Sequence, residues 1–567
     1  MEYMIFGLAV LGLVVLVVAK SIYDDRVQKN KLIHRLRHGY GDMPQKEYTS
    51  ERYTSIARYF ERHPQRGQVD DITWNDLNMD ELFMRLNAAE SSAGEEILYH
   101  LLRSPVADPK ADSENDLSRL EELVGFFLEQ PDDRVKLQLL LHKLGYTGRF
   151  SLYDYLEHLD VLGKRNNRKH RLLQFFYLPG IALCFVQPHI GVLYLVVLML
   201  YGILSYFKEK GEIDPYITSF AYIMRLLEAA SEVEALHISA IEKETARLKE
   251  HRKQLGSFKR GSFWLMSSGR MSGSSNPIDM LLDYGRMIFH LDLVKFNSML
   301  EQVRRQVQDV DVLFSTLGYL DAAVAVGAFR MSLKEGYCVP VLHGEGEPAL
   351  RAENCYHPLL THPVKNSIEA KRGVLLTGSN ASGKSTFLKT VAINAILAQS
   401  IHTVAADSYE GSYFTICSSM ALRDDLAGGE SYYIVEIRAI KRLLDLVAAG
   451  EKLLCFVDEV LRGTNTVERI AASTEILKSM AGSGVLCFAA THDVELTELL
   501  SAYYDNYHFE EEIVDGDVHF PYKLLPGKTQ TRNAIKLLGV MGYDERIIQS
   551  AELRAGAFMK TGYWEKR

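Results

Sequence analysis

Two stretches of the chain are apolar enough to be candidates for membrane-spanning helices, and the first lies near the N-terminus. Residues 4–19 carry no polar side chain, and a basic cluster follows them. A helix of this length spans about 24 Å, somewhat less than the ~30 Å hydrocarbon core of a bilayer. A cleaved signal peptide would have a positive charge before the run and a small-residue cleavage site after it, and this sequence has neither. We therefore expect a membrane anchor over residues 1–24 and a juxtamembrane segment over residues 25–69.

The second apolar stretch covers residues 172–207 and is broken by Gln187, Pro188 and His189. The break leaves two pieces of helical length, which predicts a transmembrane hairpin; a pair of helices buried in a soluble core is the alternative. Basic residues flank the stretch on both sides, as they flank the cytoplasmic ends of membrane helices. The same rule, applied to the cluster after residues 4–19, places the N-terminus outside. We expect a protein of the plasma or inner cell membrane whose remaining parts lie in the cytoplasm.

The rest of the chain shows two further patterns. Residues 70–340, apart from the apolar stretch, place apolar residues at helical spacing between charged ones, as in long helices of a core or lever domain. Residues 341–567 alternate short apolar runs with helical segments, which is typical of an α/β domain with a mostly parallel sheet. The predicted fold is an all-α domain followed by an α/β domain, with transmembrane helices at the N-terminus and within the all-α part. Strands are predicted at residues 373–377, 453–457 and 485–489, and a helix at residues 384–399.

Composition and charge narrow the classes of function. With 47% hydrophobic residues among 567, the chain can form at least two packed units and is not disordered as a whole. A net charge of -9 argues against a protein that binds nucleic acid over its entire surface, although it is compatible with a local basic face. The six cysteines form neither a CxxC pair nor a close Cys/His cluster, which predicts no zinc site and no disulfide framework.

A phosphate-binding motif follows the first predicted strand. Residues 378–386 read GSNASGKST, which matches G-x-x-x-x-G-K-[ST] and leads into the predicted helix. In such a loop the backbone N–H groups surround phosphate oxygens, Lys384 reaches the β and γ phosphates, and Ser385 binds Mg²⁺. The alternative is a glycine-rich turn without function, but the strand before it and the helix after it argue against that. We expect an ATP and Mg²⁺ site formed by Gly378, Ser379, Asn380, Ala381, Ser382, Gly383, Lys384, Ser385 and Thr386.

Two carboxylates, Asp458 and Glu459, end the second predicted strand. Asp458 is expected to hold the magnesium ion together with Ser385, and Glu459 to polarise the water that attacks the γ-phosphate. His492 ends the following strand; it is either an ordinary polar terminus or a side chain that senses the γ-phosphate, and we expect the second. The predicted reaction is the hydrolysis of ATP to ADP and phosphate.

A glycine-containing stretch, residues 424–436, leads into a helix whose first turn contains Ser431. One interpretation is a plain N-cap, because serine is a favoured capping residue. The other is that this helix N-terminus, with its partial positive charge, faces the γ-phosphate held by a second copy of the chain. The second interpretation makes Ser431 a catalytic residue that acts across a homodimer.

The motifs and their order resemble the MutS family of ATPases, which are relatives of the ABC ATPases. The resemblance is specific in the α/β domain and softer over residues 70–160 and the later helical region. It implies an ABC-type ATPase domain that dimerises around ATP, a helical lever before it and a C-terminal helical dimerisation element. The similar segments are residues 377–386 (TGSNASGKST), 398–406 (AQSIHTVAA), 429–436 (GESYYIVE), 458–466 (DEVLRGTNT) and 490–492 (ATH).

The departures from the family pattern concern DNA recognition. DNA-repair members carry a mismatch-reading domain and a connector domain before the lever, and only about seventy residues stand there in this chain, beginning with the apolar run. Ser379 and Ser382 replace a proline and a glycine of the family's loop, and Tyr432 and Tyr433 replace its Thr-Phe pair. These changes leave ATP chemistry as the expectation and do not support mismatch recognition.

A basic stretch at residues 247–260 leaves DNA open as a partner. It contains one acid, Glu250, and an aromatic residue, Phe258, with Trp264 just after it. In MutS relatives the tips of the lever helices surround DNA, and a basic stretch midway through the helical region is where that contact would fall. A solvated helix end or a face on anionic lipid is the alternative. The basic residues are Arg247, Lys249, Arg252, Lys253, Lys259 and Arg260.

The sequence therefore supports two hypotheses about the function. The first is a membrane-anchored ATPase whose lever acts on DNA. The second is an ATP-gated membrane scaffold or clamp that acts on a protein or lipid partner without mismatch recognition. A transporter is a weaker third, because three apolar segments per chain form only a small membrane domain even in a dimer.

Overall fold

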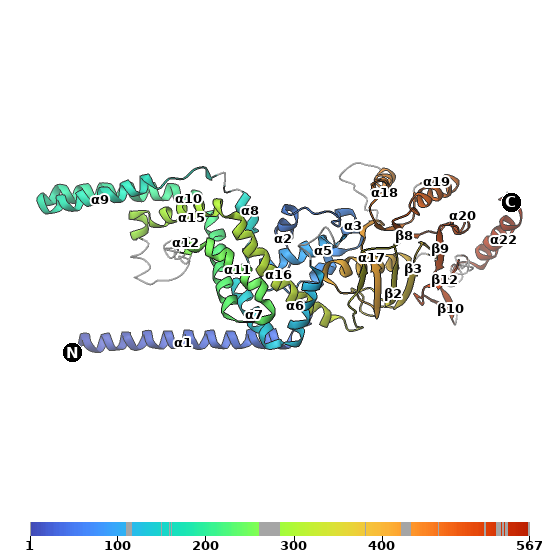
Figure 1. Cartoon of the computed structure of the whole chain (residues 1–567), viewed down its shortest axis with the longest axis horizontal. Helices are drawn as coiled ribbons and strands as arrows, with labels where there is room; N and C mark the ends of the chain where they lie inside the picture. The colour runs from blue at the N-terminus through green and yellow to red at the C-terminus, as the bar shows by residue number, and fades with distance from the viewer. Residues whose placement is uncertain are drawn as a thin grey trace. The chain divides into compact units, whose positions relative to one another are not determined.

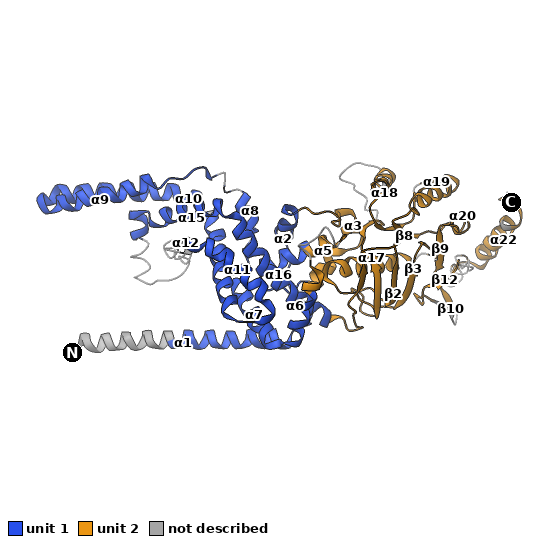
Figure 2. Cartoon of the chain, in the orientation of Figure 1, with its two compact units in different colours: residues 1–63, 87–100, 121–331 blue, residues 64–86, 101–120, 332–567 orange. Residues whose placement is uncertain are grey.

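The structure is a computed structural model of the chain, and it divides into two compact units (Figure 2). The helical unit contains residues 1–63, 87–100 and 121–331, and the α/β unit contains residues 64–86, 101–120 and 332–567. The residues that the structure describes are 2–108, 116–148, 150–157, 159, 162–259, 284–379, 382–420, 432–462, 464–514, 517–528, 535, 538 and 542–564.

All the secondary structure described in the helical unit is helical, as the spacing of apolar residues predicts. Residues 2–24 of the predicted anchor lie within the first helix, which continues through the basic cluster without a break. The α-helices labelled in Figure 1 are α1 (Glu2–His38), α2 (Ser50–Arg62), α7 (Pro131–Leu144), α8 (Leu152–Glu157), α9 (Arg168–Val186), α10 (Pro188–Ala235), α11 (Glu242–Gln254), α12 (Gly256–Lys259), α15 (Leu291–Arg305) and α16 (Val307–Ser332). A short 3-10 helix, η2 (Ser239–Ile241), lies between α10 and α11 in sequence. The helices α5 (Ser92–Arg103) and α6 (Leu117–Glu129) contribute residues to both units.

The predicted hairpin is formed by α9 and the first half of α10, which lie side by side (Figure 1). A Cβ added to Gly191 would lie 2.4 Å from the backbone nitrogen of Cys184, so the two helices touch backbone to backbone near the turn. The faces that point away from the partner helix are apolar and exposed; Phe185 is 86% and Leu204 is 73% exposed. A contiguous exposed apolar surface is a mark of a protein–protein or membrane interaction site.

Two helices with described side chains are long and apolar enough to cross a bilayer, and their burial differs. In the 18-residue apolar window of Pro188–Asp214, within α10, the mean hydropathy is 2.2 and 17% of the window is buried. In that of Val307–Ser332, the whole of α16, the mean hydropathy is 1.6 and 83% of the window is buried. Length and composition alone do not separate a membrane helix from a core helix, but burial assigns α16 to the core of the helical unit.

The α/β unit is organised around a six-stranded sheet in the order β12-β9-β4-β8-β7-β6, parallel except for the pair β12/β9. The three predicted strands are confirmed as β4, β7 and β8, whose residues are all buried, and the predicted helix is confirmed as α17. The strands are β4 (Gly373–Thr377), β6 (Thr415–Ser419), β7 (Leu453–Asp458), β8 (Val485–Ala490), β9 (Tyr504–His508) and β12 (Leu525–Pro526). The helices are α3 (Asp71–Asp76), α4 (Met79–Leu86), α17 (Lys384–Ile401), α18 (Tyr432–Ala448), α19 (Thr466–Ser479), α20 (Leu496–Leu499) and α22 (Glu545–Thr561).

Two smaller sheets complete this unit. A four-stranded mixed sheet has the order β1-β5-β2-β3, and a two-stranded hairpin pairs β10 with β11. These strands are short, and their sequences do not alternate clearly enough to predict them. Their bounds are β1 (Val341–His343), β2 (Leu350–Cys355), β3 (Asn366–Ala370), β5 (Ser408–Ser412), β10 (Glu512–Val514) and β11 (Asp517–His519).

The border between the units differs from the predicted division at residue 340, because residues 64–86 and 101–120 group with the α/β unit. Residues 64–86 are tied to this unit by buried hydrogen bonds between α3 and the end of β6. Asp76 accepts bonds from the Ser418 hydroxyl at 2.7 Å and from the Met420 backbone N–H at 2.8 Å, and Thr73 accepts one from the Ser418 N–H at 3.0 Å. Residues 101–120 are tied to it by Val106, whose N–H donates to the Gln399 carbonyl oxygen at 2.8 Å and whose carbonyl oxygen accepts from Gln399 Nε2 at 2.7 Å. Such contacts link positions at least 293 residues apart, and spacing along the chain gives no sign of them.

Candidate functional site

The loop of the phosphate-binding motif, called the P-loop below, connects β4 to α17 and is shaped by two glycines. Gly378 and Gly383 have φ angles of 145° and 107°, a region that side chains other than glycine rarely adopt. A Cβ at Gly378 would lie 2.5 Å from the carbonyl oxygen of Phe509. Because α17 begins directly after Gly383, its first N–H groups and the positive end of its dipole border the loop. The backbone therefore provides a site for an anion.

Lys384, the first residue of α17, turns its side chain back onto the loop. Its Nζ donates hydrogen bonds to the carbonyl oxygens of Gly378 and Ser379, both at 2.8 Å. Burial lowers the pKa of Lys384 to about 8, although the charges of Asp458 and Glu459 oppose this shift. A partly desolvated ammonium group of this kind interacts strongly with phosphate oxygens.

Ser382 is the clearest sign in the loop of a missing polar partner. The residue is 2% exposed, and its hydroxyl has no hydrogen-bond partner among the described residues. A buried hydroxyl left without a partner costs free energy, which a ligand oxygen at this position would recover. The loop therefore offers backbone N–H groups, a cation and an unused hydroxyl to the same ligand.

The two predicted carboxylates lie at the end of β7. Asp458 is the last residue of that strand and is 7% exposed. Glu459 follows with a φ of 61°, and its N–H donates to the carbonyl oxygen of Ala490 at 2.9 Å. This bond ties the turn to the end of the neighbouring strand β8, so that His492 comes close to Glu459.

The carboxylate of Glu459 is held on both oxygens. His492 Nε2 lies 2.6 Å from Oε1, and Arg462 Nε lies 2.8 Å from Oε2. Burial raises the pKa of Glu459, but the hydrogen bond from His492 and the charges of Arg462, His492 and Lys384 outweigh it, and the pKa lies below its usual value. Glu459 is therefore ionised and fixed in orientation at neutral pH.

Sequence reasoning did not single out two residues that support this turn, Glu436 and Arg462. Glu436, on α18, is 1% exposed, and its Oε1 accepts hydrogen bonds from the backbone N–H groups of Leu461 at 2.6 Å and Arg462 at 3.3 Å. Leu461 has a φ of 59°, so the turn contains two non-glycine residues in the left-handed region. Glu436 is the last residue of the segment GESYYIVE, so the sequence contained a sign of its importance. Its contact with the turn after β7 could not be predicted from the sequence.

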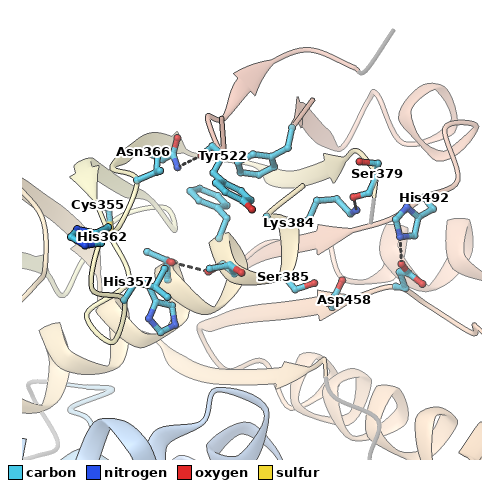
Figure 3. Close-up of a pocket in the computed structure, with 18 of the residues that line it drawn as sticks. Cys355, His357, His362, Asn366, Ser379, Lys384, Ser385, Asp458, His492 and Tyr522 are labelled. Carbon is cyan, nitrogen blue, oxygen red and sulfur yellow. Dashed lines mark hydrogen bonds and ion pairs between the residues drawn. The ribbon is translucent and has the colours of Figure 1, made fainter. Parts of the chain in front are cut away.

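One cavity of about 540 Å³ brings the predicted groups together (Figure 3). Lys384, Ser385, Asp458 and His492 face one end of it, His357 and His362 line the other end, and Tyr522 lies between the two groups, next to Gly383. The volume and the split between a polar, charged end and an end with aromatic rings suit a nucleoside triphosphate. The predicted residues that line the cavity are Ser379, Gly383, Lys384, Ser385, Thr386, Asp458, Glu459 and His492.

The donor set also fits magnesium held in part by a nucleotide. No group of three or more His, Cys, Asp or Glu side chains that could hold a metal ion occurs among the described residues. Mg²⁺ commonly binds through one or two protein oxygens and completes its shell with phosphate and water. Ser385 and Asp458 provide that kind of partial site.

Three of the predicted site residues, Asn380, Ala381 and Ser431, lie outside the described residues. The helix whose first turn was expected to contain Ser431 is described as α18 from Tyr432 onwards. The trans role of Ser431 stays a prediction.

The basic stretch at residues 247–260 is less available than its sequence suggests. Lys249 and Arg252 both form ion pairs with Glu234, at 2.7 Å. Phe258 is fully buried, and its ring packs against that of Phe220. Of the residues named for a DNA contact, Arg260 and Trp264 fall outside the described part of the chain. Phe258 is therefore a core residue and is not placed to stack on a base.

Comparison with known proteins finds relatives over the part of the chain that contains this site. Residues 374–558 match the family described as MutS domain V. The chain is 30% identical over 292 residues to the DNA mismatch repair protein MutS 2 of Haloarcula marismortui, covering 46% of this chain and 30% of that protein. It is 31% identical over 278 residues to the DNA mismatch repair protein MutS of Thermus thermophilus, covering 48% of this chain and 33% of that protein. The chain thus spans about a third of the length of the curated relatives it matches.

Proposed function

For a chain that belongs to the MutS family through its domain V, we propose that the α/β unit binds ATP with Mg²⁺ and hydrolyses it to ADP and phosphate. The observation that carries this proposal is the convergence of Lys384, Ser385, Asp458, Glu459 and His492 on one cavity. These residues come from the helix after β4 and from the ends of β7 and β8, and each has the chemistry that phosphoryl transfer requires.

The roles of the side chains follow from their charges and partners. Lys384 and the N-terminus of α17 bind the β and γ phosphates and offset negative charge there. Glu459, held by His492 and Arg462, orients a water molecule and accepts its proton. Mg²⁺, when bound by Ser385 and Asp458, neutralises charge on the phosphate oxygens.

The direct test is to purify the full chain in detergent and to measure Mg²⁺-dependent binding of ATP and release of phosphate. We expect saturable ATP binding and slow hydrolysis that chelation of Mg²⁺ abolishes. Failure of the pure protein to bind ATP at millimolar concentration would overturn the proposal. Binding without hydrolysis in the monomer and dimer alike would remove the enzymatic part and leave a nucleotide-gated clamp.

We also propose that the active form is a homodimer anchored in the cell membrane, with the ATPase in the cytoplasm. The exposed apolar faces of the α9–α10 hairpin support membrane insertion, since water is a poor environment for them. The continuous α10 supports a mechanical link, because one helix runs from the hairpin into the rest of the helical unit. ATP-driven movement of that unit would reach the membrane through this helix.

Two targets of that movement are separable by experiment. Movement on DNA is the first candidate, and an ATP-gated clamp on a protein or lipid partner is the second. The pairing of Lys249 and Arg252 with Glu234, and the burial of Phe258, favour the second. DNA binding by the full chain at low salt, with a steep loss of affinity as salt rises, would support the first; no binding by an active ATPase would exclude it.

A further inference from the structure

Glu511 is a buried carboxylate that contacts the P-loop, and the proposed reaction does not yet use it. It is 6% exposed, and its Oε2 accepts a hydrogen bond from the hydroxyl of Ser379 at 2.7 Å. Glu511 lies in the connection between β9 and β10, more than 130 residues after the loop in sequence. Its neighbours Glu510 and Glu512 make no such contact with the loop among the described residues.

The connection that carries Glu511 is fixed against the loop by backbone contacts. The N–H of Phe509 donates to the carbonyl oxygen of Thr377 at 3.0 Å, which extends the pairing of β9 with β4 by one residue. The carbonyl of Phe509 then approaches Gly378 so closely that no side chain would fit there. The position of Glu511 next to Ser379 is therefore fixed by the pairing of β9 with β4.

Ser379 is consequently held from two sides. Its carbonyl oxygen accepts a hydrogen bond from Lys384, and its hydroxyl donates to Glu511. In the related motif a proline stands at this position, and a proline ring fixes φ by itself. A serine leaves φ free, so the chain needs another restraint to keep the loop in one conformation, and the bond to Glu511 supplies it.

We infer that Glu511 is a positioning residue for ATP binding: it orders Ser379 and, through it, the backbone N–H groups that receive the phosphates. The inference rests on the proposed ATP binding. Glu511 acts through Ser379 and touches no phosphate in this scheme. Since the Ser379 proton is donated to Glu511, that hydroxyl does not donate to the nucleotide. Ordering the loop before binding raises affinity, because less conformational freedom is lost when the ligand arrives.

The first test measures the dissociation constant of Mg²⁺-ATP and the turnover number for the full chain in detergent. Glu511→Ala should weaken ATP binding about tenfold, as expected for loss of a hydrogen bond to a charged group, with a smaller effect on turnover at saturation. Glu511→Gln keeps an acceptor for the hydroxyl and should restore most of the affinity. Glu510→Ala is the matched control and should bind ATP as the wild type does.

The second test is a double-mutant cycle, which separates positioning from a general structural role. Ser379→Ala should weaken binding by the same factor as Glu511→Ala, and the double variant should be no weaker than either. In a Ser379→Pro background, Glu511→Ala should have no further effect. Effects that multiply in the double variant, or an undiminished effect of Glu511→Ala in the Ser379→Pro background, would overturn the inference. If the wild type binds no ATP, the proposed function itself fails; this outcome differs from failure of the positioning role, in which the wild type binds ATP and the variants do not behave as expected.

Discussion

His492 Nε2 lies 2.6 Å from Glu459 Oε1, and these two residues follow the ends of neighbouring parallel strands. The contact joins the side chain expected to sense the γ-phosphate to the side chain expected to activate water. A change in the position of His492 on nucleotide binding would therefore also change the orientation of the Glu459 carboxylate. In the proposed reaction, recognition of the third phosphate would then be linked to the chemical step.

Loss of the Glu459 carboxylate should separate binding from hydrolysis. Glu459→Gln keeps the shape of the side chain but removes the base, so hydrolysis should fall by a factor of about 10² or more while ATP still binds. Lys384→Ala should instead abolish productive binding, because the cation beside the phosphates is lost. Equilibrium binding of radiolabelled ATP and single-turnover phosphate release distinguish the two outcomes. Wild-type hydrolysis by the Glu459→Gln protein would show that another group activates the water.

Glu436 should matter for turnover more than for binding. In Glu436→Ala the N–H groups of Leu461 and Arg462 lose a buried acceptor, at a cost of about 1–3 kcal/mol, and the strained turn that positions Glu459 loosens. We expect a fall in the turnover number with a smaller change in ATP affinity. Lys441→Ala, an exposed change on the same helix, is the control. If Glu436→Ala lowered the ATP affinity and the turnover number equally, general unfolding of α18 would be indicated instead.

The helical unit should show a pH dependence that originates in one ion pair. His63 Nε2 lies 3.5 Å from Asp311 Oδ1, which also accepts a hydrogen bond from Tyr153 at 2.6 Å. Burial lowers the pKa of His63, but the hydrogen bond and charge of Asp311 outweigh it and raise the pKa above 6.5. Burial raises the pKa of Asp311, and the bonds from His63 and Tyr153 more than reverse this shift, so the net change is a lowering from 3.8.

The signs of these two shifts define the pH window. A raised histidine pKa stabilises the fold below about pH 6.5, and this contribution is lost as pH rises through the folded-state pKa. A lowered aspartate pKa stabilises the fold above about pH 4, and this contribution is lost as pH falls through the folded-state pKa. Amide hydrogen exchange in α2 and α16 should therefore be slowest, relative to its intrinsic rate, near about pH 5 to 6. In Asp311→Asn, local opening of α2 and α16, measured by amide hydrogen exchange, should no longer increase between about pH 6 and 8. A pH dependence of exchange equal to that of the wild type would contradict the role given to the His63–Asp311 pair.

The nucleotide site was predictable to the extent that its geometry is local. The loop at residues 378–386 and the ends of β7 and β8 are each encoded by a short segment, so spacing alone places their residues. The supports of the site are not local: Glu436 reaches Leu461, and Glu511 reaches Ser379, only because the sheet brings distant segments together. The grouping of α3 with β6 has the same origin, since it depends on Asp76 and Ser418.

The hairpin should hold the protein in the membrane after the N-terminal segment is removed. Deletion of residues 1–24 leaves the exposed apolar faces of α9 and α10 intact, so the truncated chain should stay in the membrane fraction after a carbonate wash. Tyr177 and Gly202 face each other across the two helices. Replacing residues 179–201 by a short Gly/Ser linker in the truncated chain should therefore release it. Release by the first deletion alone would return the hairpin to the interpretation of a soluble helix pair.

Hydrolysis should require two copies of the chain. The expectation rests on Ser431, which the sequence predicts in the first turn of a helix and which we expect to face the γ-phosphate held by a partner copy. Lys384→Ala chains and Ser431→Arg chains should each be inactive, and mixing them should restore part of the activity, because one of the two composite sites in a mixed dimer then contains both intact halves. Specific activity should also rise with protein concentration in detergent. Activity per chain that stays constant down to concentrations where light scattering shows a monomer would make Ser431 a helix cap only.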